Sequence, residues 1–309
     1  MSAATVASGA AQLLGGVCAA PLLPGLIQRA KAIMQGRPGP GIVQPYRELQ
    51  RLWHKQRVAP QPRTFIYEVT PPLAAGATVA AVLLVPVANV APPWPVGSDL
   101  VTLFGLLALP RFALALSAWD TGGAFGLMGA ARDLAISVWA EALLLLSLVV
   151  LALGAGTTDL RAVSAATATS HIWTEPAHWA AALGLVLWVL VETGRQPIDN
   201  PDTHLELTMI HEGPLLEYAG PDLAYLQWSA AMRHWIVLVL ATDLILPAPH
   251  AFALRLLETA IALPLWCVAL AVIETFQAKM RLLRVPLLLG AGGTVCLLGL
   301  GSWLLGAHT

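Results

Sequence analysis

Charged residues are scarce in this 309-residue chain. Asp, Glu, Lys and Arg make up 11% of it, and hydrophobic residues make up 57%. About a quarter of the residues in a soluble globular domain are charged, so the composition excludes an ordinary soluble fold. The hydrophobic residues gather in separate runs near the length of about 20 residues that a helix needs to cross a bilayer. The sequence therefore predicts an all-α integral membrane protein in contact with the lipid bilayer.

Cysteine is also rare, with three residues, Cys18, Cys267 and Cys296. All three lie inside apolar runs and none forms a CxxC pair, which is typical of small buried hydrophobic residues and not of a zinc site, an iron–sulfur cluster or a disulfide framework. We therefore expect no metal and no redox centre in this chain, so that any electrons would travel in a partner. We also expect no nucleic-acid partner.

Eight apolar segments are predicted to cross the membrane as one domain that covers residues 1–309. Their ends are uncertain by a few residues, because hydropathy locates a helix better than its boundaries. The segments are Val6 to Ile27, Thr70 to Val90, Leu100 to Trp119, Ile136 to Ala155, Ala177 to Val191, His234 to Ala248, Leu254 to Phe276 and Val285 to Leu305.

Basic residues are distributed unevenly over the predicted loops. If the first segment ends on the cytoplasmic side, most of them fall in cytoplasmic loops, only Arg161 and Arg255 remain for the other side, and Arg111 lies inside a helix. This asymmetry follows the positive-inside rule and predicts an even number of spans with both termini outside. The first loop alone holds Arg29, Lys31, Arg37, Arg47, Arg51, Lys55, Arg57 and Arg63.

That first loop contains a turn and a short helix. The run Arg37-Pro38-Gly39-Pro40-Gly41 cannot continue a helix, because proline removes a donor and glycine admits positive φ. After it, Leu49, Leu52 and Trp53 share one apolar face of a cytoplasmic amphipathic helix that lies in the membrane interface. Two interpretations stay open: lipid anchoring alone, or the wall of a binding site.

Carboxylates inside apolar helices are costly in a membrane and are candidates for a proton pathway. We predict such a pathway through Glu68, Glu141 and Glu192, with Asp243 nearer the outer side. The alternative is that a carboxylate reaches water at a helix end or pairs with an arginine, as Glu192 could with Arg195 at i+3. We favour this alternative for Glu258 and Glu274. For the deeper Glu141 and Asp243 we favour the proton pathway, because an unpaired acid is hard to explain otherwise.

A long polar loop is predicted from Glu192 to Arg233, between the fifth and sixth apolar segments. Within it Thr203 to Leu216 is compatible with a helix, on which His204 and His211 share a face with Glu212 beside them. The two histidines are seven residues apart, whereas those of an HExxH zinc helix are four residues apart. Hydrogen bonding at a partner interface is therefore favoured over a metal site. The glycine-rich loop of residues 120–141 lacks a nucleotide motif and is predicted to allow close approach of backbones.

Three motifs in this order resemble one family. The run ETGRQPIDNPDTHLELTMIHEGPLLEYAGPDLA is similar to the signature of the membrane subunit of formate hydrogenlyase and of membrane-bound NiFe hydrogenases, which are related to subunit 1 of respiratory complex I. Asp120 to Leu134 resembles the third-to-fourth loop of the hydrogenase branch, and residues 36–55 resemble the first loop of the family. The residues that match the signature are Glu192, Arg195, Pro197, Asp199, Pro201, Glu206, Tyr218 and Gly220.

The resemblance implies a bundle of about eight helices in a bacterial or archaeal plasma membrane, without a redox centre of its own. Its cytoplasmic loops would dock a hydrophilic arm made of a NiFe-type large subunit and an iron–sulfur small subunit, and antiporter-like membrane subunits would be its neighbours. Glu192, Arg195, Asp199 and Glu206 would belong to an acidic funnel. The expected docking residues are Arg37, Arg47, Asp120, Arg195, Pro197, Asp199, His204, Glu206, His211, Glu212 and Tyr218.

The sequence departs from complex I at Thr193-Gly194 and in the two histidines of the loop, and these departures favour the hydrogenase branch. Two alternatives stay open. One is a quinone-binding subunit of a complex I-like NADH dehydrogenase, in which the amphipathic helix would wall the quinone site. The other is a stand-alone secondary transporter, which is disfavoured because the chain shows no internal repeat.

Overall fold

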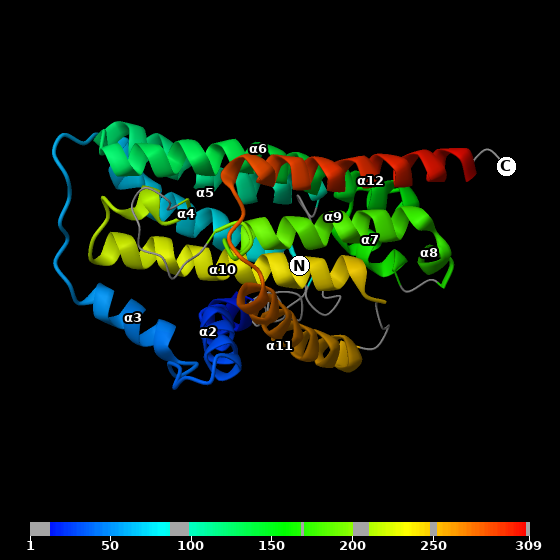
Figure 1. The fold of residues 1–309 in the computed structure, drawn as a ribbon, viewed down its shortest axis with the longest axis horizontal. Helices are drawn as coiled ribbons and strands as arrows, with labels where there is room; N and C mark the ends of the chain where they lie inside the picture. The colour runs from blue at the N-terminus through cyan, green and yellow to red at the C-terminus, as the bar shows by residue number, and fades with distance from the viewer. Residues whose placement is uncertain (1–12, 87–98, 168–169, 200–209, 248–251, 307–309) are drawn as a thin grey trace, which may run out of the picture.

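The computed structural model describes residues 13–86, 99–167, 170–199, 210–247 and 252–306. These residues are almost entirely helical (Figure 1). The helices are α2 (Leu22–Met34), α3 (Gln44–Trp53), α4 (Phe65–Leu84), α5 (Leu100–Thr121), α6 (Ala124–Ala155), α7 (Leu160–Ala166), α8 (Ser170–Thr174), α9 (Pro176–Glu192), α10 (Pro221–Ile245), α11 (Phe252–Phe276) and α12 (Val285–Gly306), with short 3-10 turns η2 (Gly213–Leu215) and η3 (Leu282–Arg284).

Seven helices of the described residues are long and apolar enough to cross a membrane, the first of them over Leu13–Met34. The remaining predicted segment, the fifth (Ala177 to Val191), is α9, a shorter apolar helix of 17 residues. The chain is therefore a multi-pass, all-α membrane protein, as its composition predicts. Short helices α7 and α8, which hydropathy did not indicate, follow α6.

Two helix starts differ from the predicted ones. α6 begins at Ala124 and not near Ile136, so most of the predicted glycine-rich loop is helical. Its glycines still bring backbones together as expected: a Cβ on Gly129 would lie 2.7 Å from Cα of Gly213. α10 begins at Pro221 and not at His234, because a proline at its first position and Asp222 in its first turn favour a helix start there.

The long loop is consequently shorter than predicted. We call residues 193–220 the signature loop and the end of the bundle where it lies the signature end. Residues 200–209 are outside the described part, and so are His204, Glu206 and half of the helix expected over Thr203 to Leu216. The described remainder, residues 210–216, forms bends and the 3-10 turn η2 instead of an α-helix.

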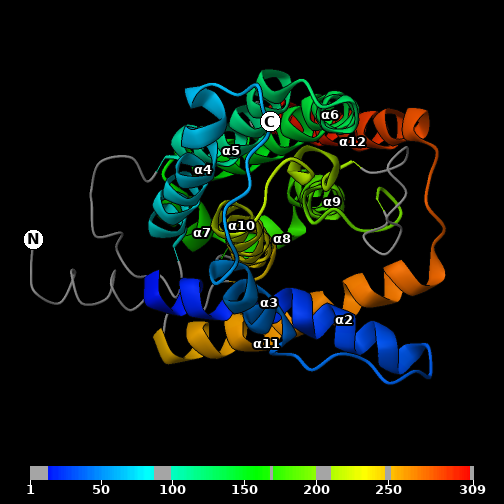
Figure 2. The same cartoon turned by 90° about the vertical axis from the view of Figure 1, so that its left-hand side faces the viewer.

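α10 is the central helix of the bundle. It packs against α4 and α9 on one side and against α2, α3 and α11 on the other (Figure 2). α5, α6 and α12 complete the larger layer, and α2 pairs with α11 in the smaller one. The middle of α10 is an apolar band, Ile236 to Ala241, in which every side chain is fully buried. The core of the protein therefore surrounds α10.

The first loop has the predicted turn and amphipathic helix. α3 begins with Pro45 near its first position, and its polar face is exposed. Trp53 at its end contacts Tyr225 of α10 edge-on, with ring centroids 4.7 Å apart. Beyond it Arg57 donates a hydrogen bond to Asp222 at 2.5 Å. These contacts attach α3 to the start of α10 at the signature end.

Candidate functional site: a buried charge network

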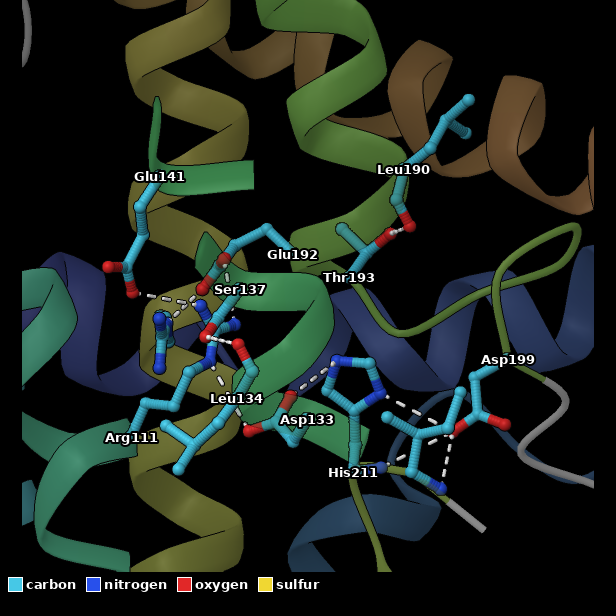
Figure 3. A network of polar contacts seen from close by, with 12 residues as sticks. Arg111, Asp133, Leu134, Ser137, Glu141, Leu190, Glu192, Thr193, Asp199 and His211 are labelled. Atoms are coloured by element: carbon cyan, nitrogen blue, oxygen red, sulfur yellow. Dashed lines mark hydrogen bonds and ion pairs between the residues drawn. The ribbon is translucent and has the colours of Figure 1, made fainter. Parts of the chain in front are cut away.

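A single arginine inside an apolar helix gathers three carboxylates. Arg111 lies within α5 and its side chain is 5% exposed. Its guanidinium contacts Asp133 Oδ2 and Glu141 Oε1, each at 3.3 Å, and Glu192 Oε2 at 3.0 Å. Figure 3 shows this arrangement, with ligands from α6 and α9 converging on one side chain. A planar guanidinium with five N–H donors can hold several carboxylates at once.

Glu192 at the end of α9 has a second basic partner, Arg233 of α10. The pairing of Glu192 with Arg195, suggested by their spacing, is wrong. α9 ends at Glu192, and Gly194 with φ of +60° turns the chain, so that Arg195 pairs with Glu274 Oε2 at 3.1 Å instead. Only a residue that tolerates positive φ can make such a turn without strain.

The signature loop connects to this group through His211. Asp199 Oδ1 accepts a hydrogen bond from Lys279 Nζ at 2.7 Å, and its Oδ2 accepts from the backbone N–H groups of Ile210 and His211 at 3.3 Å. The imidazole Nδ1 lies 3.3 Å from the same Oδ2, and Nε2 lies 3.6 Å from Asp133 Oδ1 (Figure 3). His211 therefore stands between a loop carboxylate and a helix carboxylate.

The pKa values in the loop respond to these contacts. Burial alone raises the pKa of Asp199, but the hydrogen bonds and charges of His211 and Lys279 outweigh it and hold that pKa well below its usual range. Burial lowers the pKa of His211, but the hydrogen bond with Asp199 and the charge of Asp133 outweigh it, so its net shift is upward. Both groups therefore favour their charged forms.

We call this set of eight residues the charge network. It joins α5, α6, α9, α10, the signature loop and the segment after α11 at the signature end. Two parts of it are partly exposed: Glu141, at 28%, on a membrane-spanning helix, and His211 and Lys279, at 25% and 28%, at the loop. Its members are Arg111, Asp133, Glu141, Glu192, Asp199, His211, Arg233 and Lys279.

A separate cluster surrounds Glu274 of α11. Its carboxylate accepts hydrogen bonds from Lys31 Nζ at 2.7 Å and from Arg195 at 3.1 Å, and all three side chains are buried. The predicted pairing of Glu274 with a basic side chain is confirmed. Breaking a buried ion pair by removing one partner is strongly destabilising, so this cluster holds α2 and α11 to the signature loop.

At the opposite end of the bundle, Asp243 of α10 and Arg255 of α11 form a buried pair at 2.9 Å. Arg255 also contacts Glu258 at 3.0 Å and donates to Ser164 of α7 at 2.8 Å. The pairing of Glu258 with an arginine is confirmed. The expectation that Asp243 and Glu141 are unpaired acids is wrong, because Asp243 pairs with Arg255, 12 residues away in the sequence, and Glu141 pairs with Arg111, 30 residues away.

Other predicted residues lie elsewhere at the signature end. Glu68 is exposed and contacts Arg63 at 3.3 Å. Arg37 and Arg47 are exposed on the first loop. The Asp120 carboxylate accepts from the backbone N–H groups of Thr64 and Tyr67 and so caps α4.

The rest of the signature loop is held by the backbone and by stacking. The carbonyl of Pro197 accepts from the N–H of Met280 at 2.8 Å, and Glu212 directly precedes η2. Tyr218 stacks on Tyr67 with ring centroids 4.4 Å apart, and burial raises its pKa to about 12. Among the described residues, no group of three or more His, Cys, Asp or Glu side chains could hold a metal ion.

Sequence reasoning missed four members of the network, Arg111, Asp133, Arg233 and Lys279. One signal was available, because a lone arginine inside an apolar helix indicates a functional site. The partners of Arg111 are not predictable from helical spacing, because they lie 22 to 81 residues further along the chain, on other helices.

Comparison with known proteins places the chain in a family. A sequence model described as NADH dehydrogenase matches residues 9–295. Hydrogenase-4 component C of Escherichia coli K12 is 33% identical over 294 residues, which cover 93% of this chain and 92% of that protein. Formate hydrogenlyase subunit 4 of the same organism is 32% identical over 285 residues, or 88% and 90% of the two chains.

A solved structure shares the fold. It is a chain of the membrane-bound sulfane sulfur reductase, an archaeal respiratory membrane complex, with a TM-score of 0.81 and 19% identity. The match covers 96% of this chain and 98% of that chain. The arrangement of helices around α10 therefore occurs in at least one membrane complex of known structure.

Proposed function

Because this chain belongs to the NADH dehydrogenase family, that of complex I subunit 1, we propose that it is the membrane-anchoring and proton-coupling subunit of a hydrogenase or formate hydrogenlyase complex. Its signature end faces the cytoplasm, with both termini outside. There the exposed loops dock an arm that holds a NiFe-type large subunit and an iron–sulfur small subunit. Antiporter-like membrane subunits are its lateral neighbours.

The charge network is the observation that carries this proposal. It runs from Asp199 in the signature loop through His211, Asp133 and Arg111 to Glu141 inside α6. Charged groups within a membrane bundle are costly to bury, and where they occur they mark ion pathways and proton relays. A network that begins at a loop surface and ends on a membrane-spanning helix is suited to passing a charge change from a docked arm into the membrane.

The docking part is tested by affinity purification of the tagged chain from its native membranes. We expect a NiFe-type large subunit and an iron–sulfur small subunit to copurify, and recovery to fall when Arg37 and Arg47 are changed to Glu. Arg281→Glu is the matched control, since Arg281 is also exposed at the signature end but lies outside the proposed docking set. Absence of both subunits from the wild-type preparation, under conditions that keep the membrane complex intact, would refute docking.

A second candidate function is quinone binding, as in a complex I-like dehydrogenase. The observation that favours it is a largely apolar cavity of about 400 Å³ between the first span, α3 and α10. Tyr46, Trp53, His54 and Trp228 are among its lining residues. Photolabelling by a quinone analogue at this cavity, together with inhibition of the intact complex by quinone-site inhibitors, would favour this function over the first.

A further inference from the structure

The ring of His211 is directed into the protein, between two carboxylates. Nδ1 lies 3.3 Å from Asp199 and Nε2 lies 3.6 Å from Asp133, so the imidazole bridges the loop and α6 (Figure 3). Nε2 is buried and has no hydrogen-bond partner among the described residues. Because 3.6 Å exceeds the length of a hydrogen bond, this nitrogen faces Asp133 across a gap that a small side-chain movement closes.

Gly194 provides the space for this ring. A Cβ on Gly194 would lie 3.2 Å from Nδ1 and 3.3 Å from Cγ of His211. Such contacts are tighter than ordinary van der Waals contact, so a side chain at position 194 would push the imidazole away from its carboxylates. The positive φ of Gly194 also disfavours most other residues. The absence of a side chain at Gly194 therefore allows the ring of His211 to lie between its two carboxylates.

His211 joins the two halves of the charge network. On the loop side Asp199 contacts Lys279 and His211, and on the helix side Asp133 contacts Arg111 and His211. Arginine and lysine keep their protons at neutral pH, whereas imidazole gains and loses one near it. His211 is therefore the group at this junction that can change its charge.

We propose that His211 relays protons between Asp199 in the signature loop and Asp133 in α6. This inference rests on the proposed coupling function and names the entry residue for it. A proton delivered at the Asp199 side binds Nδ1 and makes an imidazolium. The Nε2–H proton then passes to a carboxylate oxygen of Asp133, which leaves neutral imidazole protonated on Nδ1. Rotation of the partly exposed ring then brings its nitrogens to water, where Nδ1 gives up its proton and Nε2 takes one up, and the return of the ring restores the starting tautomer.

The charges around the ring set its pH range. Asp199 and Asp133 favour the imidazolium and Arg111 opposes it. Glu192 contacts Arg111 and Lys279 contacts Asp199, so their charges influence the imidazole through these two neighbours. Replacing Asp133 by Asn removes one of the two favourable charges, so it moves the titration of His211 to lower pH.

The test uses the intact complex in proteoliposomes that contain a pH-sensitive dye. Redox turnover with an artificial electron donor and proton movement are measured together over a pH range from weakly acidic to weakly alkaline. For His211→Gln, which keeps hydrogen-bonding groups but cannot carry a proton, proton movement is compared with wild type per redox turnover, in complexes of equal subunit composition. Proton movement should fall at least about tenfold, since a positioned acid–base group contributes on the order of 10² or more.

Further variants separate a relay from a structural role. Gly194→Ala keeps the histidine but displaces its ring, so it should lose proton movement as His211→Gln does. Asp133→Asn, which removes the acceptor carboxylate, should also lose proton movement, whereas Asp133→Glu, which keeps a carboxylate, should restore part of it; loss of packing alone would affect both. If His211→Gln moves protons at the wild-type rate and with the wild-type profile, the relay is refuted while the coupling function stands. If the wild-type complex moves no protons with turnover, the coupling function itself fails.

Discussion

Replacing Arg111 by Met tests whether this one side chain holds the charge network together. The guanidinium lies 3.0 to 3.3 Å from three carboxylates. At an effective dielectric constant of about 20, each contact carries about 5 kcal/mol of attraction. Most of that is offset by the cost of desolvating the charges, and measured losses on removing one partner of a buried pair are about 3 to 5 kcal/mol.

We therefore expect Arg111→Met to lower the free energy of unfolding by about 3 to 5 kcal/mol, measured by reversible unfolding in mixed micelles with tryptophan fluorescence. Arg111→Lys should lose less, because the ammonium keeps the positive charge but lacks the planar set of five N–H donors that contacts three carboxylates. Adding Glu141→Gln to Arg111→Met should recover part of the loss, since one stranded carboxylate is removed. Arg47→Met, at an exposed position, is the control. A loss below about 1 kcal/mol for Arg111→Met would refute the reasoning, because surface substitutions alone usually change stability by up to about 0.5 kcal/mol.

Glu141→Gln should reduce proton movement in the intact complex severalfold while the subunits still copurify; normal coupling with an intact complex would remove it from the pathway. The contacts of His211 raise its pKa, so they stabilise the fold fully below about pH 6.5 and lose this effect as pH rises through the raised pKa. The lowered pKa of Asp199 gives stability that is present above about pH 3.9 and lost only in acid. The stability difference between wild type and His211→Gln should therefore be larger at about pH 6 than at about pH 9, and an equal difference would contradict this. Gly129→Ala should cost about 1 to 3 kcal/mol in the same unfolding assay, whereas Gly105→Ala, with open space around it, should cost nothing.

The sequence was sufficient for the membrane-spanning helices, because apolar runs of about 20 residues have few alternatives in a bilayer. It was sufficient for α3 too, since Leu49, Leu52 and Trp53 recur at helical spacing. Helix starts were less predictable. Gly126 and Gly129 appeared to interrupt α6, but close packing against η2 makes glycine suitable inside that helix.

The charge network can be predicted only in part from one sequence. The sequence identifies Glu141 and Glu192, because a carboxylate within or at the end of an apolar segment is conspicuous, and it identifies Asp199 through the resemblance to the family signature. Their partners were not identified, because the pairing of Arg111 with Glu192 joins residues 81 positions apart. Such pairs are fixed by how α5, α6 and α9 pack, and that information is not contained in local spacing.

The apolar band of α10 limits where a charge can travel. Between His234 and Asp243 the helix has no ionisable side chain, and Arg233 and Asp243 are separated by about 15 Å of helix rise. This stretch insulates the two polar ends of the bundle from each other along its central axis. The partly exposed Glu141 is the membrane-embedded way out of the charge network. Under the proposed coupling function, a proton that enters at the signature loop would therefore leave sideways, toward a subunit packed against α6, and would not cross this subunit along α10.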